Sequence, residues 1–203
     1  MKTSKLNTIS LEMERLQKNA KWQLDYNYSL LETKSYISIL SLNTRSMQIH
    51  IDDLLNDYDL MQFDILCLQE IHLTQPTLLK RLEEFNCIPY YSKHGLLVCT
   101  KKHIKILKHI HFEEKNIEAT LANMIIHGMD IIVLNVYVAP YATLNDALHL
   151  LSKSLCNTHS NQTIAIVDDF NINMLENNNK TNRLRSYMYN YNHHFLLDTN
   201  NNQ

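Results

Sequence analysis

The sequence predicts an α+β fold in which mixed β-sheets are covered by helices. Short apolar runs typical of strands alternate with segments whose apolar residues recur every three to four positions, which is the period of a helix. In the middle of the chain several strand-like runs follow one another directly, and this excludes a regular alternation of strands and helices. Only two glycines occur in the chain, so no glycine-rich phosphate loop or dinucleotide-binding fingerprint is present.

The composition is that of an ordinary folded domain. Hydrophobic residues make up 45% and charged residues 20% of the 203 residues, and the formal net charge is -2. This charge neither indicates nor excludes a nucleic-acid partner, because a local basic strip is sufficient. The four cysteines contain no CxxC pair, which argues against a zinc ribbon and favours reduced core thiols.

The beginning of the chain is polar and lacks the apolar stretch of a signal peptide. The longest apolar run, Ile131–Ala139, is about half as long as a membrane span. We therefore expect an intracellular protein, nuclear or cytoplasmic, with no membrane partner. Residues 1–34 predict a helical lead-in or linker, because Leu11, Met13 and Leu16 have partial helical spacing. Residues 35–203 predict the folded domain.

The first half of this domain predicts two strands and two helices. The strands are Tyr36–Leu42 and Phe63–Leu68. A helix with one apolar face lies between them, and a short helix follows the second strand. The apolar positions of the two helices are Ile51, Leu54, Leu55 and Tyr58, and then Leu78, Leu79 and Leu82.

The second half predicts antiparallel strands followed by helices. Gly95–Thr100 and Ile104–Ile110 are expected to pair around Lys101 and Lys102. The remaining strands are Ile117–Ile126 and Ile131–Val138, which predict a hairpin around residues 127–130, and the buried Thr163–Val167. Two helices complete the pattern, one over residues 144–155 and one over Asn182–Asn192.

Polar side chains stand at or near the C-terminal ends of several predicted strands. Asn43, Glu70 and Asp169 each follow an apolar run, and Tyr137 lies near the end of another. Strand ends that lie side by side would gather these groups into one oxygen-rich cluster, which suits Mg²⁺ or Mn²⁺. A carboxylate after a strand is also a common turn or cap residue, so each position alone has this simpler explanation.

Four segments resemble, in order, the motifs of the endonuclease/exonuclease/phosphatase superfamily, and the resemblance covers roughly residues 36–198. The first two segments are Ser41–Ser46 and Ile65–Leu73, the latter containing Gln-Glu. The other two are Asn135–Pro140, with the pattern Asn-x-Tyr-x-x-Pro, and Ile166–Asn171, which ends in Asp-Phe-Asn. This resemblance implies a four-layer α/β/β/α sandwich that hydrolyses phosphate esters with Mg²⁺ (or Mn²⁺) and without a small-molecule cofactor.

The resemblance also implies a role for each matching side chain. Glu70 corresponds to the metal-binding glutamate, and Asn43 to the amide that supports the metal and the scissile phosphate. Tyr137 corresponds to the tyrosine that contacts the phosphate. Asp169 corresponds to the carboxylate that orients or deprotonates the attacking water, and Asn171 to a donor that stabilises the phosphate in the transition state.

Two departures from the family pattern matter. Asp168 stands where the family usually has a glycine, and it adds a negative charge beside Asp169. The family's last motif, Ser-Asp-His, has no counterpart, since the chain contains no Asp-His dipeptide. From this we expect a domain that is truncated at its C-terminal end, with an exposed sheet edge.

A narrower resemblance points to nuclease domains of mobile elements, of the Helitron or non-LTR retrotransposon type. It is carried by Glu12–Leu16, Thr44–Met47 and the acidic residues after His50. The resulting hypothesis is a DNA endonuclease domain of mobile-element origin. Two alternatives stay open, namely a catalytically inactive remnant or interaction module, and a phosphatase that acts on phosphomonoesters or phospholipid headgroups.

Overall fold

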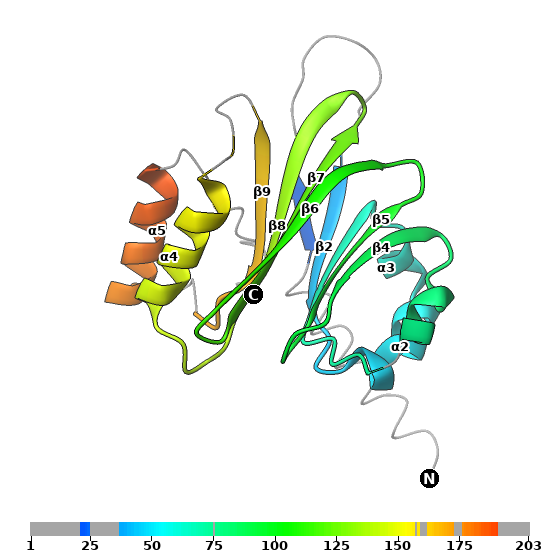
Figure 1. Ribbon diagram of the computed structural model, residues 1–203, viewed down its shortest axis with the longest axis horizontal. Coiled ribbons are helices and arrows are strands. Elements are labelled where there is room, and N and C mark those ends of the chain that lie inside the picture. The colour runs from blue at the N-terminus through cyan, green and yellow to red at the C-terminus, as the bar shows by residue number, and fades with distance from the viewer. Residues whose placement is uncertain are drawn as a thin grey trace, which may run out of the picture.

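The computed structural model describes residues 21–24, 37–74, 76–156, 158, 162–172 and 176–190. Two β-sheets pack face to face, and helices cover the outer face of each sheet (Figure 1). This is the four-layer α/β/β/α arrangement that the sequence resemblance predicts. In the described part of the chain, no helix is both long enough and apolar enough to cross a membrane.

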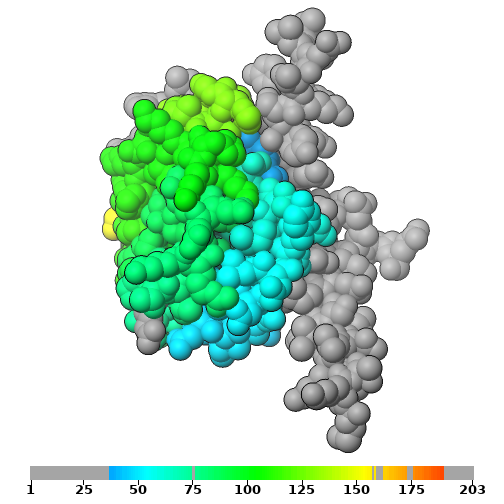
Figure 2. Space-filling model, turned by 90° about the vertical axis from the view of Figure 1, so that its right-hand side faces the viewer, coloured from blue at the N-terminus to red at the C-terminus, as the bar shows by residue number. Residues whose placement is uncertain are grey.

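The first sheet contains five strands in the order β1-β2-β3-β5-β4. β2 and β3 run parallel, and the other neighbours are antiparallel. The helices α2, α3 and η1 lie on the outer side of this sheet, and Figure 2 shows the molecule from this side. The bounds are β1 (Lys21–Leu24), β2 (Ile37–Asn43), α2 (Met47–Asn56), α3 (Tyr58–Met61), β3 (Ile65–Gln69), η1 (Pro76–Arg81), β4 (Phe85–Tyr90) and β5 (Leu96–Lys101).

The second sheet contains four strands in the order β6-β7-β8-β9. β6, β7 and β8 form an antiparallel meander, and β9 runs parallel to β8. Two helices, α4 and α5, cover its outer face. The bounds are β6 (Lys105–Glu114), β7 (Ile117–Ile126), β8 (Met129–Val138), α4 (Leu144–Leu155), β9 (Thr163–Asp169) and α5 (Asn179–Asn190).

The alternation of side chains along the strands divides the core into three layers. On β8, Val133 faces the first sheet, whereas Leu134 and Val136 pack with the helices α4 and α5. On β3, Cys67 faces the second sheet, and Leu66 packs beneath α2 and α3. The central strands β3 and β8 therefore bury both faces, because successive side chains of a strand point to opposite sides.

The hairpin between β7 and β8 was predicted correctly, and its turn is shorter than the expected residues 127–130. His127 and Gly128 have positive φ values of 50° and 79°. Ile126 pairs with Met129, so these two residues form the whole loop. Positive φ at both central positions is the geometry of a type I′ turn, which suits the twist of the strands on either side.

One predicted strand pairing is wrong. The segments Gly95–Thr100 and Ile104–Ile110 were expected to pair with each other, but β5 and β6 belong to different sheets. β5 is bonded on one side to β3 and on the other to β4. No edge of β5 is left for β6, which pairs with β7 instead.

Three other differences concern single elements. Strand β4 was not predicted, because Pro89 interrupts its pattern; the proline is tolerated because β4 lies at a sheet edge. Lys21–Leu24 forms β1 against β2, so the helical lead-in is wrong at these residues, and the rest of residues 1–34 lies outside the described residues. Tyr58 does not extend α2; it begins α3 and its side chain is exposed.

Candidate active site

The candidate site lies at one end of the two packed sheets. Asn43 is the last residue of β2, and Glu70 directly follows β3, its parallel neighbour. In the other sheet Tyr137 and Asp169 are paired residues of the parallel strands β8 and β9. The C-terminal ends of two parallel strand pairs, one from each sheet, thus bring together the four strand-end side chains among the five candidate residues.

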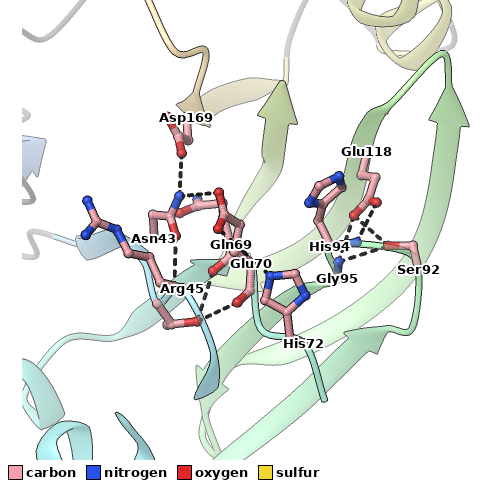
Figure 3. Close-up of polar contacts among 11 residues, drawn as sticks. Asn43, Arg45, Gln69, Glu70, His72, Ser92, His94, Gly95, Glu118 and Asp169 are labelled. Atoms are coloured by element: carbon pink, nitrogen blue, oxygen red, sulfur yellow. Dashed lines mark hydrogen bonds and ion pairs between the residues drawn. The ribbon is translucent and has the colours of Figure 1, made fainter. Parts of the chain in front are cut away.

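Asn43 connects the two sheets within this site (Figure 3). Its Nδ2 donates to Glu70 Oε1 at 2.9 Å and to Asp169 Oδ2 at 2.7 Å. Its Oδ1 accepts the backbone N–H of Arg45 at 3.0 Å. The amide is therefore fixed at both ends, with its NH₂ group between two carboxylates that come from different sheets.

Glu70 lies in a backbone segment of unusual conformation. Glu70 and His72 have φ values of 50° and 42°, a region in which residues other than glycine are uncommon. The Thr44 hydroxyl bonds to the carbonyl of Gln69 at 3.0 Å and of Glu70 at 3.1 Å. The imidazole Nε2 of His72 lies 3.9 Å from Glu70 Oε2. In this backbone conformation the side chain of Glu70 points in a direction that it would not have if β3 continued.

Tyr137 is buried beside the two carboxylates, with 2% of its surface exposed. Burial raises the pKa of its hydroxyl far above the usual range, and the Glu70 carboxylate at the hydroxyl adds to this effect. The phenol therefore keeps its proton at neutral pH. It is a hydrogen-bond donor and has no role as a base.

A layer of buried polar side chains lies beneath the site. Gln69 Nε2 donates to Ser41 Oγ at 3.1 Å and to Asn135 Oδ1 at 2.7 Å. Asn135 Nδ2 in turn reaches the carbonyls of Leu68 at 3.2 Å and Leu97 at 3.3 Å. The bonds of Asn135 cross between the sheets, whereas the bond from Gln69 to Ser41 lies within the first sheet. The sequence resemblance assigned no role to these bonds. A buried amide network of this kind fixes the relative position of its members.

Asp168, the residue that replaces the family's glycine, does not face the site. It pairs with Val136, whose side chain packs on the helix-covered face, so Asp168 and Asp169 point to opposite sides of β9. Its φ is not positive, so the position does not require glycine. Burial, with a smaller effect from the charge of Asp169, raises the pKa of Asp168 to about 7.

Asn171 lies just beyond β9 with a φ of 51°. Its Nδ2 donates to the carbonyl of Val138 at 2.7 Å, and its backbone N–H reaches Asp169 Oδ1 at 3.3 Å. One amide hydrogen of Asn171 therefore holds the end of β8. The second hydrogen is the one left for the phosphate contact that the resemblance implies.

The donor set can be compared with the needs of a metal ion. Among the described residues, no three His, Cys, Asp or Glu side chains gather into a metal site. Two carboxylates held by one amide are a hard, oxygen-rich pair. Mg²⁺ typically uses one or two protein carboxylates and completes its shell with water and phosphate oxygens, so these residues fit it.

His94 is a site residue that sequence reasoning missed. Its ring centroid lies 4.7 Å from that of Tyr137 and 6.0 Å from that of His72. Its Nε2 is buried and has no hydrogen-bond partner among the described residues. His94 belongs to the loop between β4 and β5, and no sequence signal indicates that this loop lies against the end of β8.

No protein-family model and no curated protein sequence matches this chain. Solved structures do match it. A humanized D. rerio TDP2 is 13% identical with a TM-score of 0.56 over 77% of this chain and 71% of that chain. SmcL is 16% identical with a TM-score of 0.55 over 75% of this chain and 68% of that chain.

Two further structures extend this comparison. The human Nocturnin catalytic domain, with bound sulfate, is 16% identical with a TM-score of 0.50 over 70% of this chain and 62% of that chain. C. elegans TDP2 is 14% identical with a TM-score of 0.55, and this chain spans only 48% of its length. All these structures have the endonuclease/exonuclease/phosphatase fold, and the likeness confirms that fold for this chain.

Proposed function

We propose that this chain is a divalent-metal-dependent phosphodiester hydrolase domain that cleaves DNA. The observation that carries the proposal is the Asn43 amide, which holds the Glu70 and Asp169 carboxylates at 2.9 Å and 2.7 Å. The two carboxylates come from separate sheets and are 99 residues apart in the sequence (169 minus 70). Turn or cap roles for the single residues do not account for this convergence.

Each side chain has a chemical task in this proposal. Glu70 would hold Mg²⁺ or Mn²⁺, and the bound ion would neutralise charge on the phosphate and lower the pKa of a water molecule. Asp169 accepts a proton from the attacking water as the new phosphorus–oxygen bond forms. The bond to the leaving oxygen breaks, and this oxygen keeps the electron pair and takes a proton from solvent water. Tyr137 and the free amide hydrogen of Asn171 donate to phosphate oxygens. Asn43 keeps the two carboxylates in fixed positions.

DNA is the proposed substrate for three reasons. The segments that resemble mobile-element nucleases favour DNA, and we propose a mobile-element origin for this domain. A D. rerio TDP2 structure of the same fold is complexed with single strand DNA product; it is 13% identical with a TM-score of 0.56 over 77% of this chain and 65% of that chain. Exposed Arg45, adjacent to the site, suits an anionic substrate.

The basic stretch between Lys101 and Lys108 does not contribute to this part of the proposal. Lys105 begins β6, and Glu114 at the other end of β6 pairs with Ile117 beside the site end of β8. Lys105 and Lys108 therefore lie toward the opposite end of the sheet. Lys101 forms an ion pair with Glu84 at 2.9 Å, so this stretch is explained by solvated surface contacts.

The test is nicking of supercoiled plasmid DNA by the purified chain with Mg²⁺ or Mn²⁺. We expect nicking that Glu70→Ala reduces on the order of a hundredfold or more, because the metal ligand is lost. Glu84→Ala is the matched control, since it removes an exposed carboxylate in an ion pair outside the site. Equal nicking by Glu70→Ala and the unmodified chain would contradict the proposal, as would hydrolysis of phosphomonoesters in preference to DNA.

A second candidate is a catalytically inactive binding module of the same fold. One observation favours it. Asn171 donates one amide hydrogen to the Val138 carbonyl, so this hydrogen does not reach a phosphate. Calorimetry with Mn²⁺ separates the two candidates. A chain that binds Mn²⁺ through Glu70 but leaves plasmid DNA and a panel of phosphate esters intact would favour the inactive module.

A further inference from the structure

A buried carboxylate outside the proposed site carries one further inference. Glu118 lies in β7 with 1% of its surface exposed. It accepts hydrogen bonds from the Ser92 hydroxyl at 2.5 Å, the His94 N–H at 3.0 Å and the Gly95 N–H at 2.9 Å (Figure 3). Removing a carboxylate from water is strongly unfavourable unless such donors compensate the loss of hydration. Glu118 therefore fixes the conformation of the loop formed by Ser92–Gly95, which we call the 92–95 loop.

The 92–95 loop is bonded in turn to the segment that carries Glu70. The N–H of Ile71 donates to the Gly95 carbonyl at 3.2 Å, and the N–H of His72 donates to the His94 carbonyl at 3.1 Å. His94 and Gly95 thus donate to Glu118 through their N–H groups and accept from the Glu70 segment through their carbonyls. A chain of hydrogen bonds runs from β7 of the second sheet, through this loop, to the segment after β3.

The Glu70 segment needs such support. Its positive φ values at Glu70 and His72 are unfavourable for residues other than glycine and persist only where the surroundings enforce them. The approach of the loop is also close, because a Cβ on Gly95, whose φ is 83°, would lie 2.7 Å from Ile71 Cγ1. Only glycine allows the loop backbone to reach Ile71 in this way.

We infer that Glu118 is a positioning residue, which sets the direction of the metal-binding Glu70 through the 92–95 loop. This inference rests on the proposed function of Glu70 as a metal ligand. Glu118 lies 48 residues from Glu70 (118 minus 70) and in the other sheet. Its carboxylate is bonded to the 92–95 loop, and backbone hydrogen bonds join this loop to the Glu70 segment. Glu118 therefore acts on the site through the loop.

The test compares Glu118→Gln with Leu151→Ala. Glu118→Gln keeps the shape of the side chain but removes its charge and one acceptor oxygen. Leu151→Ala is the control for stability, because Leu151 is a buried residue of α4, on the far side of the second sheet. We expect Mn²⁺ affinity, measured by calorimetry on the folded variants, to fall about tenfold in Glu118→Gln, as for supporting residues of metal sites. Affinity should be unchanged in Leu151→Ala.

A second measurement does not depend on metal binding. Amide hydrogen exchange at Ile71 and His72 should become faster in metal-free Glu118→Gln than in Leu151→Ala, because their carbonyl partners belong to the 92–95 loop. If the unmodified chain binds no Mn²⁺, the proposed function fails, and exchange alone then decides whether Glu118 holds this segment. Unchanged exchange at both residues overturns the inference.

Ser92→Ala provides a milder variant in case Glu118→Gln does not fold. It removes one of the three donors to Glu118, and we expect Mn²⁺ affinity to fall about threefold, with faster exchange at Ile71 and His72. Where the unmodified chain binds Mn²⁺, normal Mn²⁺ affinity in a folded Glu118→Gln variant overturns the inference. If only Ser92→Ala folds, normal affinity in that variant overturns it.

Discussion

The two sheets contribute to the candidate site in different ways. The second sheet supplies Tyr137 and Asp169 from regular, paired strand positions, so register alone places them. The first sheet supplies Glu70 from a segment of positive φ that is held by hydrogen bonds from outside its own strand. One carboxylate is thus positioned by local sheet geometry and the other by a tertiary network. This difference predicts which substitutions affect chemistry alone and which affect the structure as well.

The largest effect is expected in the second sheet, where Asp169→Asn should separate chemistry from structure. The asparagine keeps an oxygen that accepts from Asn43, so the unfolding temperature should hardly change. Loss of the proton acceptor should lower the rate of plasmid nicking by roughly 10²–10⁴-fold. Asp168→Asn is the control, since that side chain faces away from the site. An equal loss of nicking activity in both variants would contradict the assignment of Asp169 and Asp168 to different faces of β9.

Tyr137→Phe tests the same sheet with a smaller change. Removing one donor to the phosphate should lower kcat/KM by roughly 10²-fold, while Mn²⁺ affinity stays unchanged. Because the pKa of Tyr137 is raised by burial and Glu70, the pH–rate profile of the unmodified chain should contain no tyrosine titration near neutral pH. A fall in activity that follows loss of a tyrosine proton in this range would assign the residue a different role.

Asn135→Leu tests the connection between the two sheets. Asn135 accepts from Gln69 and donates to carbonyls of the first sheet, and its loss removes one hydrogen-bond partner from each of these buried groups. We expect the free energy of unfolding, measured with urea, to fall by about 2–3 kcal/mol. Adding Gln69→Leu should recover part of this loss, because two apolar side chains leave fewer buried polar groups unsatisfied. A further large loss in the double variant would contradict this explanation.

The smallest effect concerns Asp168 and the dependence of stability on pH. Its pKa of about 7 in the folded chain compares with 3.8 for the ordinary carboxyl. Between pH 4 and pH 7 the folded chain therefore holds a proton that the unfolded chain has released, and stability should fall as the pH rises through this window. Asp168→Asn should remove this fall, worth roughly 1–2 kcal/mol after allowance for partial solvent exposure. Identical urea midpoints across this window for both proteins would show that Asp168 does not titrate there.

Much of the fold could be predicted because the strand and helix patterns are local. The alternating and helical periods located β2, β3, β7, β8, β9, α4 and the β7–β8 hairpin within a few residues. The partners of β5 and β6 could not be predicted correctly. A short connection has the same sequence pattern whether its two strands pair with each other or belong to different sheets. The number of neighbours that β5 already has is a property of the whole sheet.

The sequence by itself determined which chemical groups stand at the strand ends, Asn43, Glu70, Tyr137 and Asp169 among them, because the order of apolar and polar residues is written in it. Only the tertiary structure decided that one amide binds two of these carboxylates, and that Asp168 faces the helices. It also decided that Glu118 and His94 belong with the site. These relations depend on contacts between residues far apart in the chain, which packing of the two sheets creates and local periodicity does not encode.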